Sequence, residues 1–179
     1  MPLRLRLAAL AVALLSPAAL AAEPAPSFTF PAIEGGTLDT ADWRGRPVLV
    51  VNTASMCGFT PQYDGLQDLQ DRYGARGLVV LAVPSDDFRQ ELDTAKEVKE
   101  FCALNFDLSL PMTDIEHVRG SAAHPFYRWV RETSGFAPGW NFNKVLLDGE
   151  GQVVGHWGAT TEPEAPEITQ AIEPLLTKG

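Results

Sequence analysis

Two apolar, β-branched runs separated by a helical pattern constrain the fold of this chain more than any other feature. VLVVNTA (48–54) and LVVLAVP (78–84) are almost wholly apolar, which is typical of strands buried on both faces of a sheet. Between them, apolar and aromatic side chains from Tyr63 to Tyr73 recur at helical spacing. A strand–helix–strand unit of this length forms a right-handed crossover, so we expect the two strands to be parallel.

The remaining segments add helices and an antiparallel pair of strands to this unit. SFTF (27–30) is a candidate edge strand, and the segment 35–47 is rich in turn residues. KVLLDGEGQVVGHWG (144–158) indicates two strands around a glycine-rich turn. Helical spacing predicts three further helices, at 94–106, 121–133 and 163–178. This order predicts a single α/β domain with a thioredoxin-like fold, in which helices cover both faces of a central mixed sheet.

The first 21 residues have the order of a secretory signal peptide. Two arginines precede an apolar run (7–15), and small residues follow it. The run is shorter than the ~20 residues of a membrane-spanning helix, which argues against an anchor. We therefore expect cleavage after Ala21 or Ala22, a mature domain within 22–179, and a periplasmic or secreted protein.

Charge and histidine spacing argue against two classes of function. The net charge of −9 disfavours binding to the phosphate backbone of a nucleic acid. His117, His124 and His156 are scattered and lack the spacing of metal ligands. We expect no metal site and no cofactor.

Cys57 is expected where open α/β sheets place their chemistry, beyond the carboxyl end of the strand 48–54 and at the N-terminus of the next helix. Unpaired backbone N–H groups and the helix dipole stabilise negative charge at such a place, so the thiol is a candidate nucleophile. A small buried core residue is the alternative. In an oxidising compartment, a structural disulfide with Cys102 is another.

The residues around Cys57 exclude three classes of thioredoxin-fold protein. Thr60 stands where a Cys-x-x-Cys motif has its second thiol, and Pro61 stands where copper chaperones carry theirs. Val50 and Ala54 occupy the places of the proline and the threonine or serine that precede a peroxiredoxin cysteine. Cys57 therefore has no second thiol in its own motif.

Four segments resemble the glutathione peroxidase family. NTASMCGFTPQYDGLQDL (52–69) is similar to its active-site signature, and WNFNKVLLD (140–148) is similar to its later Trp-Asn-Phe motif. EVKEFC (97–102) and HPFYRWV (124–130) also match in order and spacing. The resemblance covers residues 28–176.

The resemblance implies an enzyme that reduces hydrogen peroxide and organic hydroperoxides. Cys57 matches the peroxidatic residue, whose thiolate attacks the O–O bond and becomes a sulfenic acid. Trp140 and Asn141 match two of its polar partners, and both side chains can donate hydrogen bonds to developing negative charge. Core packing is the alternative for Trp140.

The segment PSDDFRQE (84–91) departs from the family pattern Pro-Cys-Asn-Gln-Phe-Gly. Ser85 replaces the cysteine, Asp87 falls where the glutamine belongs, and one residue is missing, so that Arg89 stands for two. An ionised Asp87 accepts hydrogen bonds only and would repel a thiolate. We expect Asp87 either to handle a proton near Cys57 or to cap a helix or turn.

Cys102 matches the resolving cysteine of the thioredoxin-dependent branch, with a buried core cysteine as the alternative. The resemblance implies an intramolecular disulfide with Cys57. Because disulfide geometry needs Cα atoms within ~7 Å, we expect local unwinding at 97–104 on oxidation. The short connection 131–139 resembles that of monomeric members. The implied reductant is a thioredoxin-like protein, with glutathione as the alternative.

Two other functions stay open. In a redox sensor or disulfide relay, the Cys57–Cys102 disulfide would pass to a partner protein. In an inactive thioredoxin-fold binding module, Asp87 would have abolished the peroxide reaction.

Overall fold

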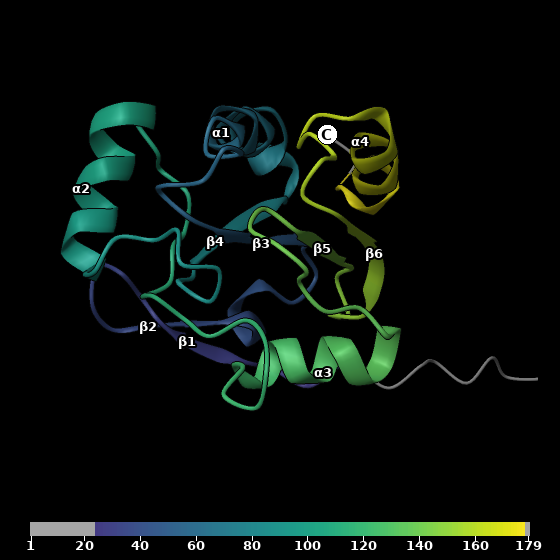
Figure 1. Ribbon diagram of the computed structural model, residues 1–179. Helices are drawn as coiled ribbons and strands as arrows, with labels where there is room; N and C mark the ends of the chain where they lie inside the picture. The colour runs from purple at the N-terminus through teal and green to yellow at the C-terminus, as the bar shows by residue number, and fades with distance from the viewer. Residues whose placement is uncertain (1–23, 178–179) are drawn as a thin grey trace, which may run out of the picture.

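Strand β3 (Val48–Thr53) lies inside a four-stranded mixed sheet with the order β4-β3-β5-β6. The computed structural model describes residues 24–177 and is shown in Figure 1. As expected, β3 runs parallel to β4 (Val79–Pro84). It is antiparallel to β5 (Lys144–Leu147), which pairs with β6 (Val153–Trp157) in a hairpin. The sheet has the predicted mixed form.

Helices cover both faces of this sheet (Figure 1). One face carries α1 (Gln62–Tyr73), α2 (Ala95–Phe106) and α4 (Pro166–Ile172), and the other carries α3 (Pro125–Ser134). Successive side chains of β3 alternate between two apolar cores. Leu49 and Val51 pack with α1, α2 and α4, and Val48 and Val50 pack with α3. Each fully buried aliphatic side chain contributes roughly 1.5–3 kcal/mol.

The N-terminal strand differs from its prediction. β1 (Thr29–Pro31) pairs with β2 (Thr37–Asp39) in a separate two-stranded sheet, and β2 lies in a segment expected to consist of turns. Gly35 and Gly36, both with positive φ, form the turn between them. Strands of three residues are too short to show an alternating pattern, so the sequence does not predict this hairpin.

Prolines set the boundaries of two helices. α3 begins at Pro125 rather than at 121, because the residue before a proline is disfavoured in helical conformation and His124 caps the helix instead. α4 ends at Ile172 and continues as a 3₁₀ turn, Glu173–Leu175, because Pro174 lacks an N–H. Between residues 24 and 177, no helix has both the length and the apolar character needed to cross a membrane.

Asn52, near the end of β3, attaches a distant turn to the sheet. Its side-chain Nδ2 donates to the Trp140 carbonyl at 2.9 Å, and its Oδ1 accepts from the Asn143 N–H at 3.1 Å. Between these residues Phe142 has a φ of +60°, which is rare for a bulky side chain. Its N–H donates to the Asn52 carbonyl. Asn52 thus stabilises a strained turn next to the strand that leads to Cys57.

Replacing Asn52 by alanine should lower the free energy of unfolding by about 1–3 kcal/mol, because the buried Asn143 N–H loses its acceptor. The Trp140 carbonyl loses one donor and keeps the one from the Asn143 side chain. Urea denaturation of both proteins measures this difference. Asn105→Ala is the matched control, since the Asn105 side chain is exposed on α2 and bonds only to the Phe101 carbonyl of its own helix. Equal effects of the two substitutions would contradict the role of Asn52.

Candidate active site

Cys57 lies in the loop between β3 and α1, beyond the carboxyl end of β3 as expected. α1 begins only at Gln62, so Cys57 precedes the helix instead of opening it. The intervening residues form successive turns, in which the Thr60 N–H donates to the Cys57 carbonyl at 3.1 Å. Cys57 is therefore positioned by backbone groups of these turns rather than by the first helical turn.

One of these N–H groups points at the sulfur. The Phe59 N–H donates to Cys57 Sγ at 3.4 Å, and the Cys57 N–H donates to Thr60 Oγ1 at 3.1 Å. A donor at the sulfur stabilises negative charge there. The Cys57 side chain is 8% exposed, so it is largely shielded from water but not sealed off from the surface.

Gln90 connects the loop of Cys57 to Asn141. The carbonyl of Gln90 accepts from the Met56 N–H at 2.8 Å, and its side-chain Oε1 accepts from Asn141 Nδ2 at 3.0 Å. Asn141 is fully buried. Sequence reasoning missed Gln90. The available signal was that the segment 84–91 is one residue shorter than the family pattern. The missing residue leaves open which side chain of this loop takes the place of the family glutamine.

Trp140 lies at the surface beside this group. Its side chain is 42% exposed, so core packing does not explain it. Its ring centroid lies 5.4 Å from that of Phe88, and the Arg119 guanidinium sits 5.0 Å from the Phe88 ring. The indole N–H of Trp140 remains a candidate donor to a bound peroxide.

Asp87 ties its loop to the segment 117–119. Its Oδ1 lies 2.7 Å from His117 Nδ1, and its Oδ2 accepts from the N–H groups of Val118 at 2.7 Å and Arg119 at 3.0 Å. The hydrogen bond that His117 makes to the Asp87 carboxylate, and then the charge of that carboxylate, raise the pKa of His117. These contacts are those of a turn cap. The proton-handling role of Asp87 remains a prediction.

Arg89 has the backbone of the glycine it replaces. Its φ is +57°, a conformation that glycine adopts at little cost and other residues rarely adopt. The turn at this place is therefore present although the loop is shortened.

Cys102 lies on the inner face of α2, and its side chain is only 2% exposed. Burial raises the pKa of its thiol to about 11. Cys57 and Cys102 are both free thiols and belong to the same apolar core. The helix of Cys102 is capped by Thr94, whose Oγ1 accepts from the Glu97 N–H at 3.3 Å and donates to Glu97 Oε2 at 2.8 Å.

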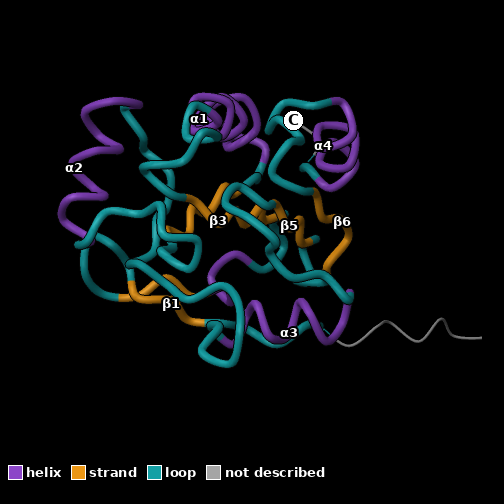
Figure 2. The backbone as a smooth tube through the Cα atoms, viewed as in Figure 1, coloured by secondary structure: helices purple, strands orange, loops and turns teal. Residues whose placement is uncertain are grey.

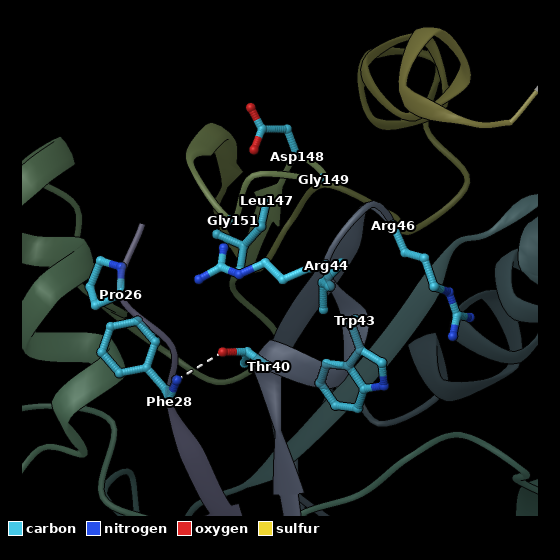
Figure 3. A pocket seen from close by; sticks show the side chains of 11 residues that line it. Pro26, Phe28, Thr40, Trp43, Arg44, Arg46, Leu147, Asp148, Gly149 and Gly151 are labelled. Carbon is cyan, nitrogen blue, oxygen red and sulfur yellow. Dashed lines mark hydrogen bonds between the residues drawn. The ribbon is translucent and has the colours of Figure 1, made fainter. Parts of the chain in front are cut away.

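The candidate catalytic residues Cys57, Asp87, Trp140 and Asn141 all lie in loops, which are teal in Figure 2. A separate pocket, shown in Figure 3, contains none of them. There, Arg44 donates to the carbonyls of Ala25 and Glu150. In the part of the chain that the structure describes, no group of three or more His, Cys, Asp or Glu side chains could hold a metal ion.

The chain is similar in sequence to proteins of one known family. A profile described as glutathione peroxidase matches residues 27–131. A glutathione peroxidase of Lactococcus lactis is 40% identical over 149 residues, covering 80% of this chain and 94% of that protein. The hydroperoxy fatty acid reductase gpx1 of Synechocystis is 39% identical over 163 residues, covering 83% of this chain and 94% of that protein.

Solved structures agree on the fold. T. cruzi GPX1 superposes with a TM-score of 0.64 at 28% identity, covering 83% of this chain and 93% of that one. A thioredoxin family protein of Chlorobium tepidum superposes with a TM-score of 0.62 at 17% identity, covering 87% of this chain and 99% of that one. The second likeness concerns the fold alone. The chain therefore has a thioredoxin-like fold and belongs to the glutathione peroxidase family.

Proposed function

We propose that this peroxidase reduces hydrogen peroxide and organic hydroperoxides, with Cys57 as the peroxidatic residue. The observation that carries the proposal is the Phe59 N–H, which donates to the sulfur of Cys57. Asn141 is joined to the same loop through Gln90. The thiolate attacks the O–O bond and becomes a sulfenic acid, while hydroxide or alkoxide leaves. Asn141 and Trp140 stabilise the charge that develops on the leaving oxygen.

We propose further that Cys102 resolves the sulfenic acid and that a thioredoxin-like protein reduces the resulting disulfide, with glutathione as the alternative donor. The matching position of Cys102 supports this assignment. Relatives named glutathione peroxidase-like peroxiredoxins in Chlamydomonas reinhardtii and Saccharomyces cerevisiae, at 38% and 37% identity, also support it. The short connection 131–139 favours a monomer. Continuous turnover with a thioredoxin system would distinguish an enzyme of this kind from a disulfide relay.

One equivalent of hydrogen peroxide should remove two hydrogen atoms from the reduced protein and link Cys57 to Cys102, as intact mass and peptide mapping will show. Cys102→Ser should instead retain an added oxygen on Cys57, and Cys57→Ser should not react. Amide exchange at 97–104 should accelerate in the oxidised protein, since Cys102 must leave its helix. An unchanged mass of the wild-type protein would favour the inactive binding module.

Asp87→Ala separates the two roles of Asp87. Because the carboxylate oxygens already bind the segment 117–119, we expect the rate of Cys57 oxidation to change by less than about twofold. The free energy of unfolding should fall by about 1–3 kcal/mol. Stopped-flow measurement of peroxide reduction gives the rate, and exposed Asp93→Ala is the matched control. A rate loss of about tenfold or more in Asp87→Ala alone would assign proton handling.

We also propose that the protein is exported, to the periplasm or outside the cell. The support is the order of charged, apolar and small residues in 1–21, which lies outside the described residues. Protein recovered from the periplasm of a bacterial host should begin at Ala22 or Glu23, as its intact mass will show. Recovery of the full-length chain from the cytosol alone would refute export.

A further inference from the structure

One side-chain hydroxyl holds together the backbone around Cys57. Thr60 Oγ1 accepts from the Cys57 N–H at 3.1 Å, and it lies 2.7 Å from the Cys57 carbonyl oxygen and 2.8 Å from that of Ala54. All three residues are buried. Because buried backbone groups must find their hydrogen-bond partners within the protein, this one oxygen satisfies groups that are shielded from water.

The proton of the Thr60 hydroxyl connects the loop to the sheet. A hydroxyl donates one hydrogen bond, and here two carbonyl oxygens lie within reach. The Cys57 carbonyl already accepts from the Thr60 N–H at 3.1 Å, so the hydroxyl proton can serve Ala54. Ala54 directly follows Thr53, the last residue of β3. The hydroxyl thus joins the end of a fully buried strand to the N–H of Cys57.

These contacts are not those of a helix cap. A threonine ahead of a helix usually accepts from an N–H group of the first helical turn. Helix α1 begins at Gln62, its N-cap is Pro61, and no side chain caps it. The hydrogen bonds of the Thr60 hydroxyl instead reach back to residues 54–57. The hydroxyl therefore serves the loop of Cys57 and not the helix.

The donor at the sulfur lies inside the turn that Thr60 closes. Phe59, whose N–H donates to Cys57 Sγ at 3.4 Å, directly precedes Thr60. The turn is closed from the Thr60 N–H to the Cys57 carbonyl, and from the Cys57 N–H to the Thr60 hydroxyl. Without the hydroxyl only the first of these bonds would remain. The direction of the Phe59 N–H would then be less closely fixed.

We propose that Thr60 is a positioning residue for the reaction of Cys57, because its hydroxyl keeps the Phe59 N–H directed at the sulfur. This inference rests on the proposed function, in which the Cys57 thiolate attacks a peroxide. A donor at the sulfur stabilises the thiolate, and the thiolate is the nucleophile. Thr60 stands where a Cys-x-x-Cys motif has its second thiol. At that place this chain has a hydroxyl that organises the loop.

Thr60→Val tests the proposal, because valine keeps the branched shape of threonine but has no hydroxyl. Reduced protein is alkylated with iodoacetamide at pH 7 or, separately, mixed with hydrogen peroxide, and peptide mapping follows Cys57 in both reactions. Both rates should fall by about tenfold. The deficit in alkylation should shrink as the pH rises, because alkaline solution ionises the thiol in both proteins. Thr60→Ser retains the hydroxyl and should keep both rates within about twofold of wild type.

Thr40→Val is the matched control. Thr40 and Thr60 are each 7% exposed, and the Thr40 hydroxyl accepts from the Phe28 N–H at 2.8 Å in the separate pocket of Figure 3. Thr40→Val should lower the free energy of unfolding in urea to a similar degree as Thr60→Val, while leaving both rates of Cys57 unchanged. Thr60→Ala takes the place of Thr60→Val if the valine variant does not fold.

A fall of less than about threefold in Thr60→Val, or faster reaction, would overturn the proposal. Equal slowing in Thr60→Ser or in Thr40→Val would also overturn it, because the effect would then not depend on the hydroxyl at this place. If wild-type Cys57 were alkylated but did not react with peroxide, the proposed function would fail. The alkylation rates would still decide the role of Thr60.

Discussion

Complete burial of β3 is the constraint on which the rest of the structure depends. All six of its residues are buried, its two faces contribute to two different apolar cores, and strands pair with both of its edges. A strand held on every side has a single register and a single end point. The loop that carries Cys57 therefore leaves the sheet at a defined place, and Asn52 can stabilise the turn of Trp140 and Asn141 beside it.

The candidate site is assembled from loops that hydrogen bonds join to one another. Gln90 bonds to the loop of Cys57 through its carbonyl and to Asn141 through its side chain, while Asp87 holds the segment 117–119. Loops positioned by a rigid sheet can combine precise geometry with local freedom. This arrangement suits the proposed reaction, in which the sulfur of Cys57 meets first a peroxide and then a second thiol.

The two thiols lie in different electrostatic settings. Cys57 has a backbone donor at its sulfur, whereas Cys102 is buried in the apolar core, and burial raises the pKa of its thiol to about 11. Thr53, Ser55, Tyr63 and Glu91 each have a buried side-chain oxygen without a hydrogen-bond partner in the described chain, which lowers stability.

The sequence by itself determined the central features of the protein. Apolar runs and helical spacing indicated β3, α1 and β4, and the position of Cys57 after β3 followed from them. Similarity of motifs pointed to Trp140 and Asn141. These features depend on local periodicity and on motif identity, both of which can be read along the chain.

Only the tertiary structure decided which groups meet across the chain. The contacts of Gln90 with Asn141, of Asp87 with 117–119, and of Asn52 with Asn143 join residues that are 51, about 30 and 91 positions apart. Local pattern contains no information about such pairs, because they depend on how the packed sheet directs its loops. For the same reason the sequence indicated Cys57 and Asn141, but only the tertiary structure placed Gln90 between them.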